Sequence, residues 1–562
     1  MKLRFKRGLV LVFVIALMAT TLLACAGSGG SGSTDTGSTG TSDSGNAGAE
    51  KSETPAAPEK PKELEKVRVS LWDRSNAPDG TPILEGMLVK HIVELAKTEG
   101  LDVEFVPLPR AQESEKNSTW MASGGGPDIL ITYDVNAVFK WAEQGGLTPL
   151  DDLIAQHGQD IVKVAGPAME AAGTYKGVRY AIPALRMNQA AGASMKIRQD
   201  WLDKLGMQAP TTIEELYTVL KAFKEQDPGG VGKENVVPWA LPAINQGMRG
   251  FFFGPMYGFG LLNDGPHTEM YWASGNFKDG VFTSSVAMEE GKEYFRWMNR
   301  LYKEGLISKE FVTDINNQQY IQHITTGTAG FTESNDDPWG QMTVQTRKTV
   351  PGAKWVTLEA LKGPDGKQHQ NLAGTYGLYN IIPKSSKNPA AAVKYLNFMA
   401  KNITLFQSGI EGEHYSVQNG VRVAIDPDKN AKELAWYLPD LNLLTQGYMG
   451  IPTAEQMEIM YSKQTPEDRA EMIPMYEAYY KNFTEHGKTQ PLIDTPRPVA
   501  EKSLVNITKY LYEALSKAII APDFDKEWEA VVSGWEKNGG REYDAEVTEA
   551  LKAMNYKSWA EQ

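Results

Sequence analysis

The chain of 562 residues contains one cysteine, Cys25. Without a second cysteine no intramolecular disulfide can form, so the core alone must hold the folded part together. Basic clusters are also scarce, because the formal net charge is −13 and the charge is spread along the chain. A phosphate backbone would be repelled by such a surface, and we expect no nucleic-acid partner.

Motifs of catalysis and of metal binding are missing as well. The seven histidines are scattered, and none belongs to an H-E-x-x-H motif. No G-x-S-x-G elbow is present, and Gly124 to Gly126 lack the Gly-Lys-Ser/Thr that completes a phosphate-binding loop. We therefore expect no catalytic residues, no metal and no cofactor.

The apolar run at the beginning of the sequence is too short for a comfortable bilayer span. Four basic residues precede this run over 8–21, and Leu22-Leu23-Ala24-Cys25 follows it. This order is typical of a secretory signal that ends in a lipobox. We predict a signal peptide over 1–24 and a lipid, palmitate included, on Cys25. An uncleaved anchor helix with an incidental cysteine is the alternative.

Residues 25–65 contain the lipidated cysteine and a stretch of Gly, Ser, Thr, Asp, Ala and Pro with almost no apolar side chains. Such a composition cannot repay the entropy of ordering, so we predict a disordered tether. The remaining length is more than one core usually organises, which predicts at least two lobes. The 13 Trp and 23 Tyr residues suggest surfaces built for stacking.

Strand and helix patterns alternate where the folded part begins. Alternating or continuous apolar residues predict strands at 67–72, 103–106 and 127–132, with helices over 83–99 and around 138–144 between and after them. This alternation indicates an α/β fold with a mostly parallel sheet covered on both faces.

Several stretches, in this order and spacing, resemble the extracellular solute-binding proteins of the maltose-binding type, in particular the large lipoprotein branch of Gram-positive bacteria. They are Gly124-Gly125-Gly126-Pro127-Asp128-Ile129-Leu130, Ala142 to Leu150, Arg179 to Pro183, Ile197 to Gly206, Leu301 to Ile307 and Gly409 to Tyr415. The resemblance covers nearly all of the chain after the tether.

The resemblance implies a type II periplasmic-binding-protein fold, in which a multi-crossing hinge joins two α/β lobes and the ligand cleft lies between them. Lobe one would hold 66–183 plus 378–422, and lobe two 184–377 plus 423–562. The implied protein is a monomer at the outer face of the cell membrane, anchored there through Cys25. It would capture a solute and deliver it to the permease subunits of an ABC importer.

Candidate ligand-binding residues of the first lobe follow predicted strands. In open α/β sheets the ligand meets the carboxyl ends of strands, which favours Trp72, Asp73, Arg74, Tyr133 and Asp134. Flat aromatic faces suit the C–H face of a sugar, and planar polar side chains suit its hydroxyls, so we predict a carbohydrate ligand and favour an oligosaccharide. Trp72 could instead fill a groove on the lobe surface.

Further candidates come from the second lobe and the crossings between lobes. On the family template Asn335, Asp337 and Trp339 stand where relatives present an aromatic residue to sugar, and Trp239 is a possible platform. The remaining candidates lie near the crossings and in the Gly-Glu-x-His-Tyr-like turn: Arg186, Asn188, Tyr376, Glu413 and Tyr415. Arg186 could instead form a salt bridge in the hinge.

Three other functions stay open at this point, and one of them is a surface adhesion or sensory partner protein with the same fold. The ligand could be a peptide or another polar solute, since fold analogy does not decide this. Carboxylate pairs such as Asp336 with Asp337 could also serve a lipid-anchored glycosidase or lyase, although acids on a solvated surface are the commoner meaning.

Overall fold

Two four-stranded β-sheets organise the part of the chain that the computed structural model describes, namely residues 63–188, 194–242, 254–266, 275–314, 317–334, 341–372, 374–493 and 495–562. The predicted signal peptide, Cys25 and nearly all of the predicted tether lie outside these ranges. Within them, no helix is both long and apolar enough to cross a membrane.

The first sheet takes most of its strands from the part of the chain predicted to be lobe one, and β17 comes from a segment predicted to be lobe two. Its strand order is β17 (Thr445–Gln446), β6 (Ala181–Arg186), β14 (Tyr376–Ile381) and β3 (Leu130–Thr132). β14 runs antiparallel to both β6 and β3. β6 carries the chain out of this lobe and β14 brings it back, so the two strands run in opposite directions and the sheet is mixed rather than mostly parallel.

A parallel pair of long strands extends this lobe. β1 (Glu65–Asp73) pairs with β2 (Leu101–Pro109), and α1 (Met87–Thr98) connects them. A bridge from Val69 to Ile129 links β1 to the start of β3. The predicted strands and the predicted helix are therefore confirmed. The other helices of this lobe are α2 (Glu113–Ser123), α3 (Val135–Glu143), α4 (Asp151–His157), α5 (Gln159–Ala171), α12 (Pro389–Lys401), α13 (Ile403–Ser408) and α15 (Leu438–Leu441).

The second sheet lies in the part predicted to be lobe two. Its strand order is β12 (Trp355–Thr357), β7 (Ser194–Arg198), β11 (Ala329–Ser334) and β8 (Val237–Ala240). The helices of this part are α6 (Gln199–Leu205), α7 (Ile213–Gln226), α8 (Gly254–Tyr257), α9 (Glu289–Lys303), α10 (Gln318–Thr325), α11 (Gln341–Thr349), α16 (Ala454–Met460), α17 (Pro466–His486), α18 (Pro498–Ile520), α19 (Phe524–Lys537) and α20 (Gly540–Ala553).

Short paired strands complete the fold. They are β4 (Thr174–Tyr175) with β5 (Val178–Arg179), β9 (Gly275–Lys278) with β10 (Val281–Ser284), β13 (Gln370–Leu372) with β18 (Gly487–Thr489), and β15 (Tyr415–Gln418) with β16 (Val421–Ala424), which α14 (Pro427–Glu433) follows.

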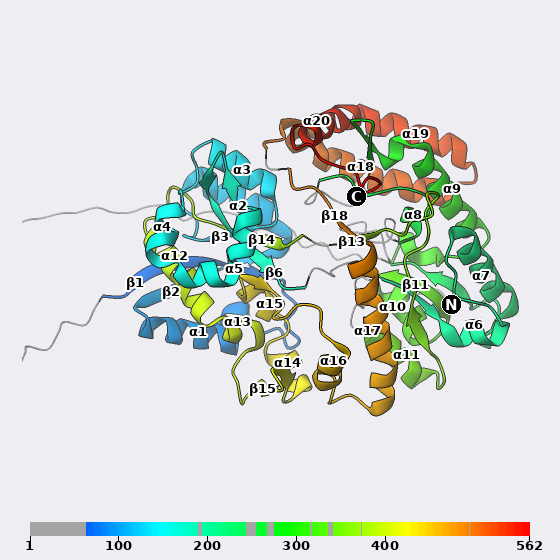
Figure 1. Ribbon diagram of the computed structural model, residues 1–562, viewed down its shortest axis with the longest axis horizontal. Helices are drawn as coiled ribbons and strands as arrows, with labels where there is room; N and C mark the ends of the chain where they lie inside the picture. Colours follow the sequence, from blue (N-terminus) through cyan, green and yellow to red (C-terminus); the bar gives the residue numbers. More distant parts are fainter. Residues whose placement is uncertain are drawn as a thin grey trace, which may run out of the picture. The chain divides into compact units, whose positions relative to one another are not determined.

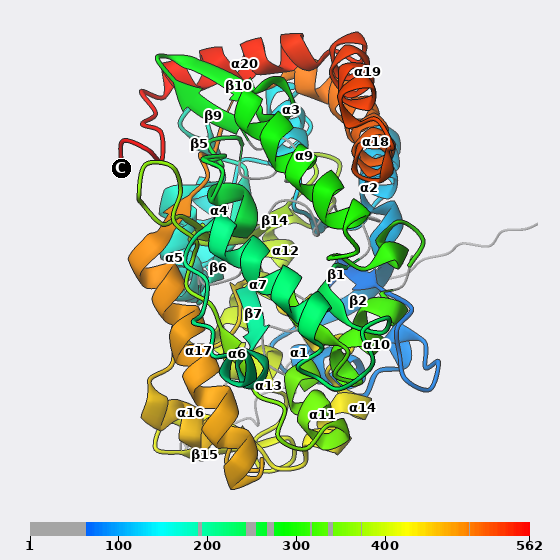
Figure 2. The ribbon, with the colours of Figure 1, turned by 90° about the vertical axis from the view of Figure 1, so that its right-hand side faces the viewer.

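Each sheet has its own apolar core. The first core packs β1 and β2 against α1 and α12, and the second packs the second sheet against α7, α9 and the three helices at the end of the chain. Figure 2 shows α9, α18, α19 and α20 next to one another, and they contact each other directly. In Figure 1 the elements of the first core carry mainly blue to yellow colours, and those of the second mainly green to red.

The residues that pack in the first core suggest a change to one expected boundary between the lobes. Leu434, Tyr437, Leu441 and Leu444 pack in the first core, although the sequence assigned them to lobe two. They follow the hairpin of β15 and β16 and lead into β17, the edge strand of the first sheet. The lobe boundaries stay a prediction, and we propose to move the later one past Gln446.

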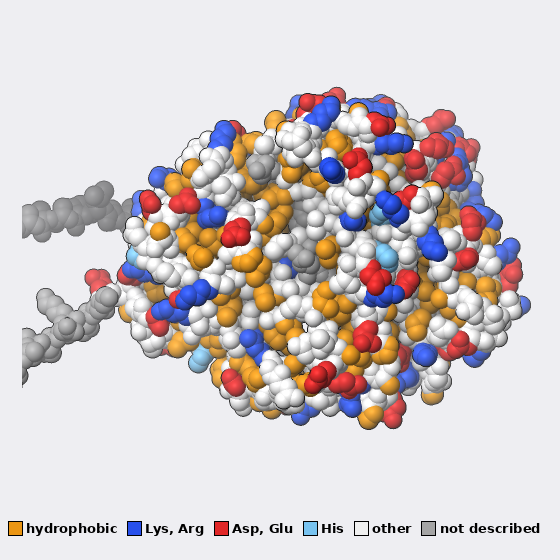
Figure 3. All heavy atoms as spheres, viewed as in Figure 1, with side chains coloured by type: hydrophobic (Ala, Val, Ile, Leu, Met, Phe, Trp, Pro, Cys, Tyr) orange, Lys and Arg blue, Asp and Glu red, His pale blue; other side chains and the backbone are white. Residues whose placement is uncertain are grey.

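Charged side chains of both signs are interspersed on the face seen in Figure 3, and no basic area dominates it. This distribution agrees with the net charge of −13. A surface of this kind offers no extended positive field to a polyanion.

Candidate functional site

Two aromatic rings meet where β1 and β3 end. Trp72 is the second-last residue of β1, and Tyr133 directly follows β3. Their rings are stacked with centroids 5.3 Å apart and an interplanar angle of 16°. Two residues that are 61 positions apart in the sequence thus meet at adjacent strand ends, as the strand-end rule predicts.

Arg74 and Asp440 form a two-pronged ion pair beside these rings. The Nε of Arg74 donates to Oδ2 of Asp440 at 2.6 Å, and its Nη2 donates to Oδ1 at 2.8 Å. The Asp440 side chain is 4% exposed and that of Arg74 is 42% exposed. The hydrogen bond to Asp440 raises the pKa of Arg74 above its ordinary value. Asp440 lies on α15, and sequence reasoning missed it.

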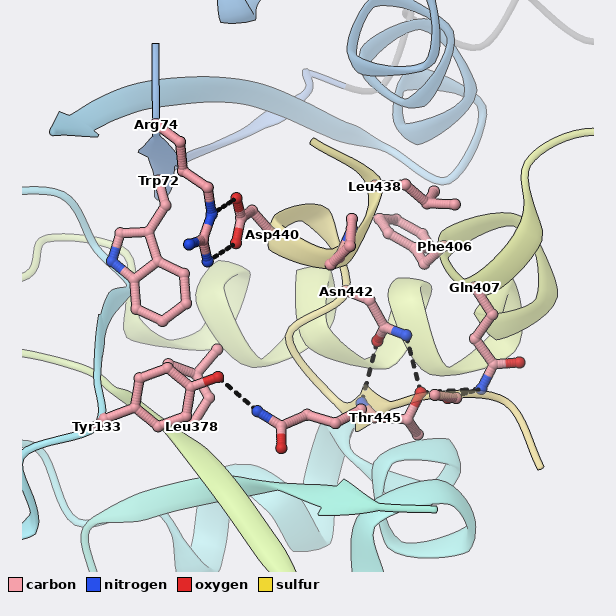
Figure 4. A pocket seen from close by; sticks show the side chains of 13 residues that line it. Trp72, Arg74, Tyr133, Leu378, Phe406, Gln407, Leu438, Asp440, Asn442 and Thr445 are labelled. Carbon is pink, nitrogen blue, oxygen red and sulfur yellow. Dashed lines mark hydrogen bonds and ion pairs between the residues drawn. The ribbon is translucent and has the colours of Figure 1, made fainter. Parts of the chain in front are cut away.

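A cavity of about 350 Å³ lies against this pair and the aromatic rings, as Figure 4 shows. Its apolar and aromatic lining consists of Trp72, Tyr133, Leu378, Phe406, Leu438 and Pro439. Its polar side chains are Arg74, Gln407, Asp440, Asn442, Thr445 and Gln446. A concave, largely apolar surface with a few convergent polar groups is the usual form of a small-molecule site.

The amide side chains of the cavity hold two hydroxyl groups in place. Asn442 and Gln407 donate to Oγ1 of Thr445 at 2.8 and 2.9 Å, and Gln446 donates to the Tyr133 hydroxyl at 2.5 Å. Each hydroxyl oxygen therefore accepts, and its own hydrogen is left to donate. Burial raises the pKa of Tyr133, which keeps the phenol protonated. Sequence reasoning missed the amides, since no local motif marks them.

A second arginine, Arg110, packs on the aromatic pair and does not line the cavity. The guanidinium carbon of Arg110 lies 4.4 Å from the centroid of the Trp72 ring, and its Nη1 donates to Glu113 at 2.6 Å. Glu113 is 7% exposed, and burial raises its pKa, although Arg110 opposes this change. Arg110 thus holds the orientation of the rings through cation–π contact.

Residues 77–403 match the sequence pattern of the bacterial extracellular solute-binding proteins. The chain belongs to this family. Its two mixed sheets with separate cores agree with the two-lobe α/β fold that the resemblance implied. Solved structures of ABC-transporter solute-binding proteins share this fold.

Three similar proteins illustrate the relationship. Lipoprotein LipO of Bacillus subtilis is 24% identical over 500 residues, which cover 86% of this solute-binding protein and 91% of LipO. The polygalacturonan/rhamnogalacturonan-binding protein YtcQ of the same organism is 25% identical, with 83% and 88% covered. The structure of FusA of S. pneumoniae, an ABC-transporter substrate-binding protein in complex with kestose, superimposes with a TM-score of 0.64 at 18% identity, with 87% and 99% covered.

Two predicted acids of this solute-binding protein, Asp73 and Asp134, accept hydrogen bonds from nearby backbone N–H groups and do not line the cavity. The carboxylate of Asp73 accepts from the backbone N–H of Ser75 at 2.8 Å. Asp134 caps α3, where it accepts from the N–H of Ala137 at 3.1 Å. Both lie at the expected strand ends, but neither lines the cavity.

Of the predicted residues near the crossings, Arg186 bonds to a residue that lines the cavity. Arg186 donates to Oε1 of Gln446 at 2.9 Å and to the carbonyl of Gly374 at 3.3 Å. It therefore ties the segment before β14 and the strand β17 to β6. Asn188 donates to the Tyr480 hydroxyl at 3.3 Å. Tyr376 is buried on β14, and burial raises its pKa.

Trp239 corrects one prediction. Its side chain is 1% exposed in the core of the second lobe, with Phe331 at 5.2 Å and Trp297 at 6.0 Å between ring centroids. A strand end is also a place where a large ring can complete the core, and the local sequence does not distinguish the two roles. Trp239 is therefore a core residue and not a platform for a ligand.

Glu413 and Tyr415 do not line the cavity. Glu413 pairs with Lys429 at 2.9 Å, and Tyr415 is buried on β15. Glu413 also belongs to a group with His414 and Glu433 whose possible ligand atoms lie within 4.8 Å of one another. However, Nδ1 of His414 accepts from the N–H of Ile410 at 3.0 Å, which leaves the hydrogen on Nε2. This tautomer turns an N–H toward Glu433 and does not suit a metal ligand.

The predicted contacts of the second lobe, Asn335, Asp337 and Trp339, lie outside the described residues. They stay predictions. The last described residues before them belong to β11, whose Glu333 is 4% exposed and accepts from the N–H of Gly254 at 2.5 Å.

Proposed function

We propose that this chain is the extracytoplasmic substrate-binding lipoprotein of an ABC importer that captures a carbohydrate, namely an oligosaccharide, and delivers it to the permease. The observation that carries the proposal is the first-lobe cavity, where a stacked aromatic pair borders an Arg–Asp pair and a set of ordered amides. The second-lobe residues predicted from the family template would complete the cleft.

The chemistry of the cavity suits a sugar. Ring C–H groups pack on aromatic and apolar side chains, and hydroxyls need both donors and acceptors when they are buried. The cavity supplies apolar surface through Trp72 and Leu378, donors through Arg74 and Thr445, and an acceptor through Asp440. These groups are held by bonds among themselves, which reduces the entropy lost on binding.

The similar proteins support a carbohydrate over a peptide. YtcQ is named for binding polygalacturonan and rhamnogalacturonan, and FusA was solved with kestose. Both names describe binding proteins and not enzymes. We propose that this chain likewise binds its ligand without changing it, and that closing of the lobes around the ligand is the signal to the permease.

A thermal-shift screen tests the ligand class. A solute that binds only the folded state raises the melting temperature, so oligosaccharides and peptides are compared on the chain without its first 25 residues. A rise with a glycan that is recovered intact afterwards is the expected result. A rise with peptides alone would overturn the carbohydrate assignment, and a shortened glycan would instead support a glycosidase or lyase.

We also propose that the lipid on Cys25 anchors the protein at the outer face of the cell membrane. The similar protein LipO is named a lipoprotein, and Cys25 stands in a lipobox. Cells grown with labelled palmitate should label the protein, and Cys25→Ala should remove the label and release the protein into the medium. Label that persists in the variant would contradict this anchor.

The permease partner is tested in cells. Deletion of the gene should abolish uptake of the glycan found in the screen, and the wild-type gene should restore it. Two permease genes alongside would agree with transport, whereas a sensor kinase alone would favour a role in signalling. We expect the protein to act as a monomer, which its mass in solution would check.

A further inference from the structure

Among the described residues that line the first-lobe cavity, the charged ones are Arg74 and Asp440, and they pair with each other. The guanidinium uses two of its N–H groups, on Nε and Nη2, for the carboxylate. Its side chain is 42% exposed, so the remaining N–H groups have access to a ligand. The wall therefore presents a donor and an acceptor side by side, with their charges balanced.

Asp440 has a fixed position on this wall. It lies on α15, whose neighbour Tyr437 accepts from the N–H of Leu88 in the first core at 3.0 Å. Its two oxygens each accept one bond from Arg74, and each can accept another. A group that enters the cavity thus meets a carboxylate that needs donors.

The neutral groups on the wall have complementary roles. The hydroxyls of Tyr133 and Thr445 accept from amides, and each has its hydrogen left to donate. Arg186 stands next to this set, where Gln446 Oε1 and the carbonyl of Gly374 accept from it. It does not line the cavity. Arg110 is also outside the lining and is paired with Glu113.

We propose that this cavity binds an uncharged sugar residue, with neighbouring hydroxyls on the Arg74–Asp440 pair, and that Asp440 selects against uronic acids. This inference rests on the proposed function and assigns the charge class of the glycan, which the names of the similar proteins leave open.

The expected preference follows from the hydrogen-bond donors and acceptors that Arg74 and Asp440 offer to a ligand. A sugar hydroxyl can donate to Asp440 and accept from Arg74 at the same time, whereas a carboxylate can only accept. A uronate would place a second negative charge beside Asp440, and the charge of the Arg74 guanidinium is already balanced by the two-pronged pair. Like charges in a desolvated site are costly, so the discrimination is strong.

Matched pairs of trisaccharides test the proposal on the chain with Cys25→Ser. Each pair has one linkage and differs only at C6: trigalacturonate with its carboxyl-reduced form, and cellotriose and mannotriose with their C6-oxidised forms. Affinities are measured by calorimetry for every pair that shifts the melting temperature. We expect the uncharged member to bind about tenfold or more tightly. Tighter binding of the uronate member would overturn the inference.

Asp440→Asn is the decisive variant, because it keeps the shape of the side chain and removes its charge. The variant leaves the Arg74 guanidinium without its counter-charge, so we expect weaker binding of the uncharged glycan and tighter binding of its uronate form. The ratio of the two affinities should fall by about tenfold or more. An unchanged ratio would overturn the role of Asp440.

A matched control is Glu104→Gln, which removes the carboxylate of another Arg pair of the same lobe. Glu104 accepts from Arg68 at 3.3 Å, and its side chain is 66% exposed on β2, outside the cavity. It should leave both affinities unchanged. If Asp440→Asn lowers the yield of folded protein, the double variant Arg74→Gln with Asp440→Asn removes both charges and should also lose the preference.

The outcomes separate this inference from the proposed function. Glycan binding that favours uronates contradicts the charge class and leaves a carbohydrate-binding protein. Binding of peptides without any glycan contradicts the proposed function, and the inference fails with it.

Discussion

Two buried carboxyl groups stand near strand ends in the two lobes, Asp440 beside the end of β1 and Glu333 in β11. Each side chain is about 4% exposed. Asp440 accepts two bonds from the guanidinium of Arg74. Glu333 accepts from the backbone N–H of Gly254 at 2.5 Å, and the described residues bring no Lys or Arg into an ion pair with it. Burial raises the pKa of Glu333 to about 8.

The difference shows that burial alone does not tell what an acid does. Because Arg74 supplies a guanidinium, Asp440 of the first lobe belongs to a charged pair on the wall of the cavity. Glu333 of the second lobe is buried among described residues that bring no guanidinium to it, and its protonated, neutral form is therefore favoured. The same contrast applies to two tryptophans of low exposure: Trp72 borders cations and a hydroxyl, whereas Trp239 borders Phe331 and Trp297. The neighbours, more than the exposure, separate a site from a core.

The largest expected effect comes from removing the Trp239 ring, the apolar member of this comparison, from the second core. Trp239→Ala should lower the free energy of unfolding by about 3–5 kcal/mol, because it leaves a cavity in the second core. Denaturation with urea measures the loss. The folded fraction should keep its affinity for the glycan identified in the screen, and a loss of affinity in that fraction would return Trp239 to the site.

The next effect is a pH dependence of the second lobe. The pKa of Glu333 is about 8 in the folded state and ordinary, near 4.5, in the unfolded state. The folded protein therefore binds the proton more tightly, and its stability decreases as the pH rises from about 4.5 to 8. Glu333→Gln should remove this decrease and raise the free energy of unfolding at pH 8.5 by on the order of 3 kcal/mol. Glu290→Gln, at an exposed position of α9, should leave the pH profile as it is.

A smaller effect is expected from changing the Arg74–Asp440 pair, the polar member of this comparison. Arg74→Lys keeps the charge, but an ammonium cannot reproduce the two-pronged geometry on Asp440. The affinity for the glycan should fall by about tenfold with little change in stability, as calorimetry and denaturation would measure. Arg68→Lys, in the exposed pair with Glu104, is the control. Equal affinity losses in the two variants would speak against a special role of Arg74.

The smallest effect concerns one hydroxyl. Tyr133→Phe keeps the stacked ring and removes the group that accepts from Gln446. We expect a loss of about 0.5–1.5 kcal/mol in glycan binding, that is, a few-fold higher Kd. Tyr217→Phe in the second lobe, whose hydroxyl donates to Glu304 at 2.8 Å, provides the comparison and should leave the Kd unchanged. Unchanged binding in both variants would remove the Tyr133 hydroxyl from the site.

Local patterns predicted much of the fold and one edge of the site. The predicted strand at 67–72 lies within β1, and the predicted helix over 83–99 contains α1. Trp72, Arg74 and Tyr133 were found because strand ends can be recognised from alternating and apolar runs. These predictions depend on residues that are close together in the sequence, where periodicity carries information.

The rest of the site depends on pairings that no local pattern encodes. β17 has two residues, too few for a period, and it brings Gln446 beside Arg186 only because it pairs with β6. Asp440 lies on a helix of four residues in a segment that the resemblance assigned to the other lobe. Trp239 failed for the opposite reason, since its strand end is real but the space beyond it is filled by the core.

The Arg74–Asp440 pair joins residues that are 366 positions apart, and the strand that positions Gln446 comes after the entire second sheet. During translation β1 and Tyr133 are synthesised early, and Asp440 is synthesised late. The first sheet and its cavity can therefore be completed only after most of the chain has been synthesised. Closure of such a long loop is slow, because its entropy must be lost before the distant contacts form. A chain that is slow to assemble its first core stays unfolded longer, which is the state in which a polypeptide can be threaded through a secretion channel.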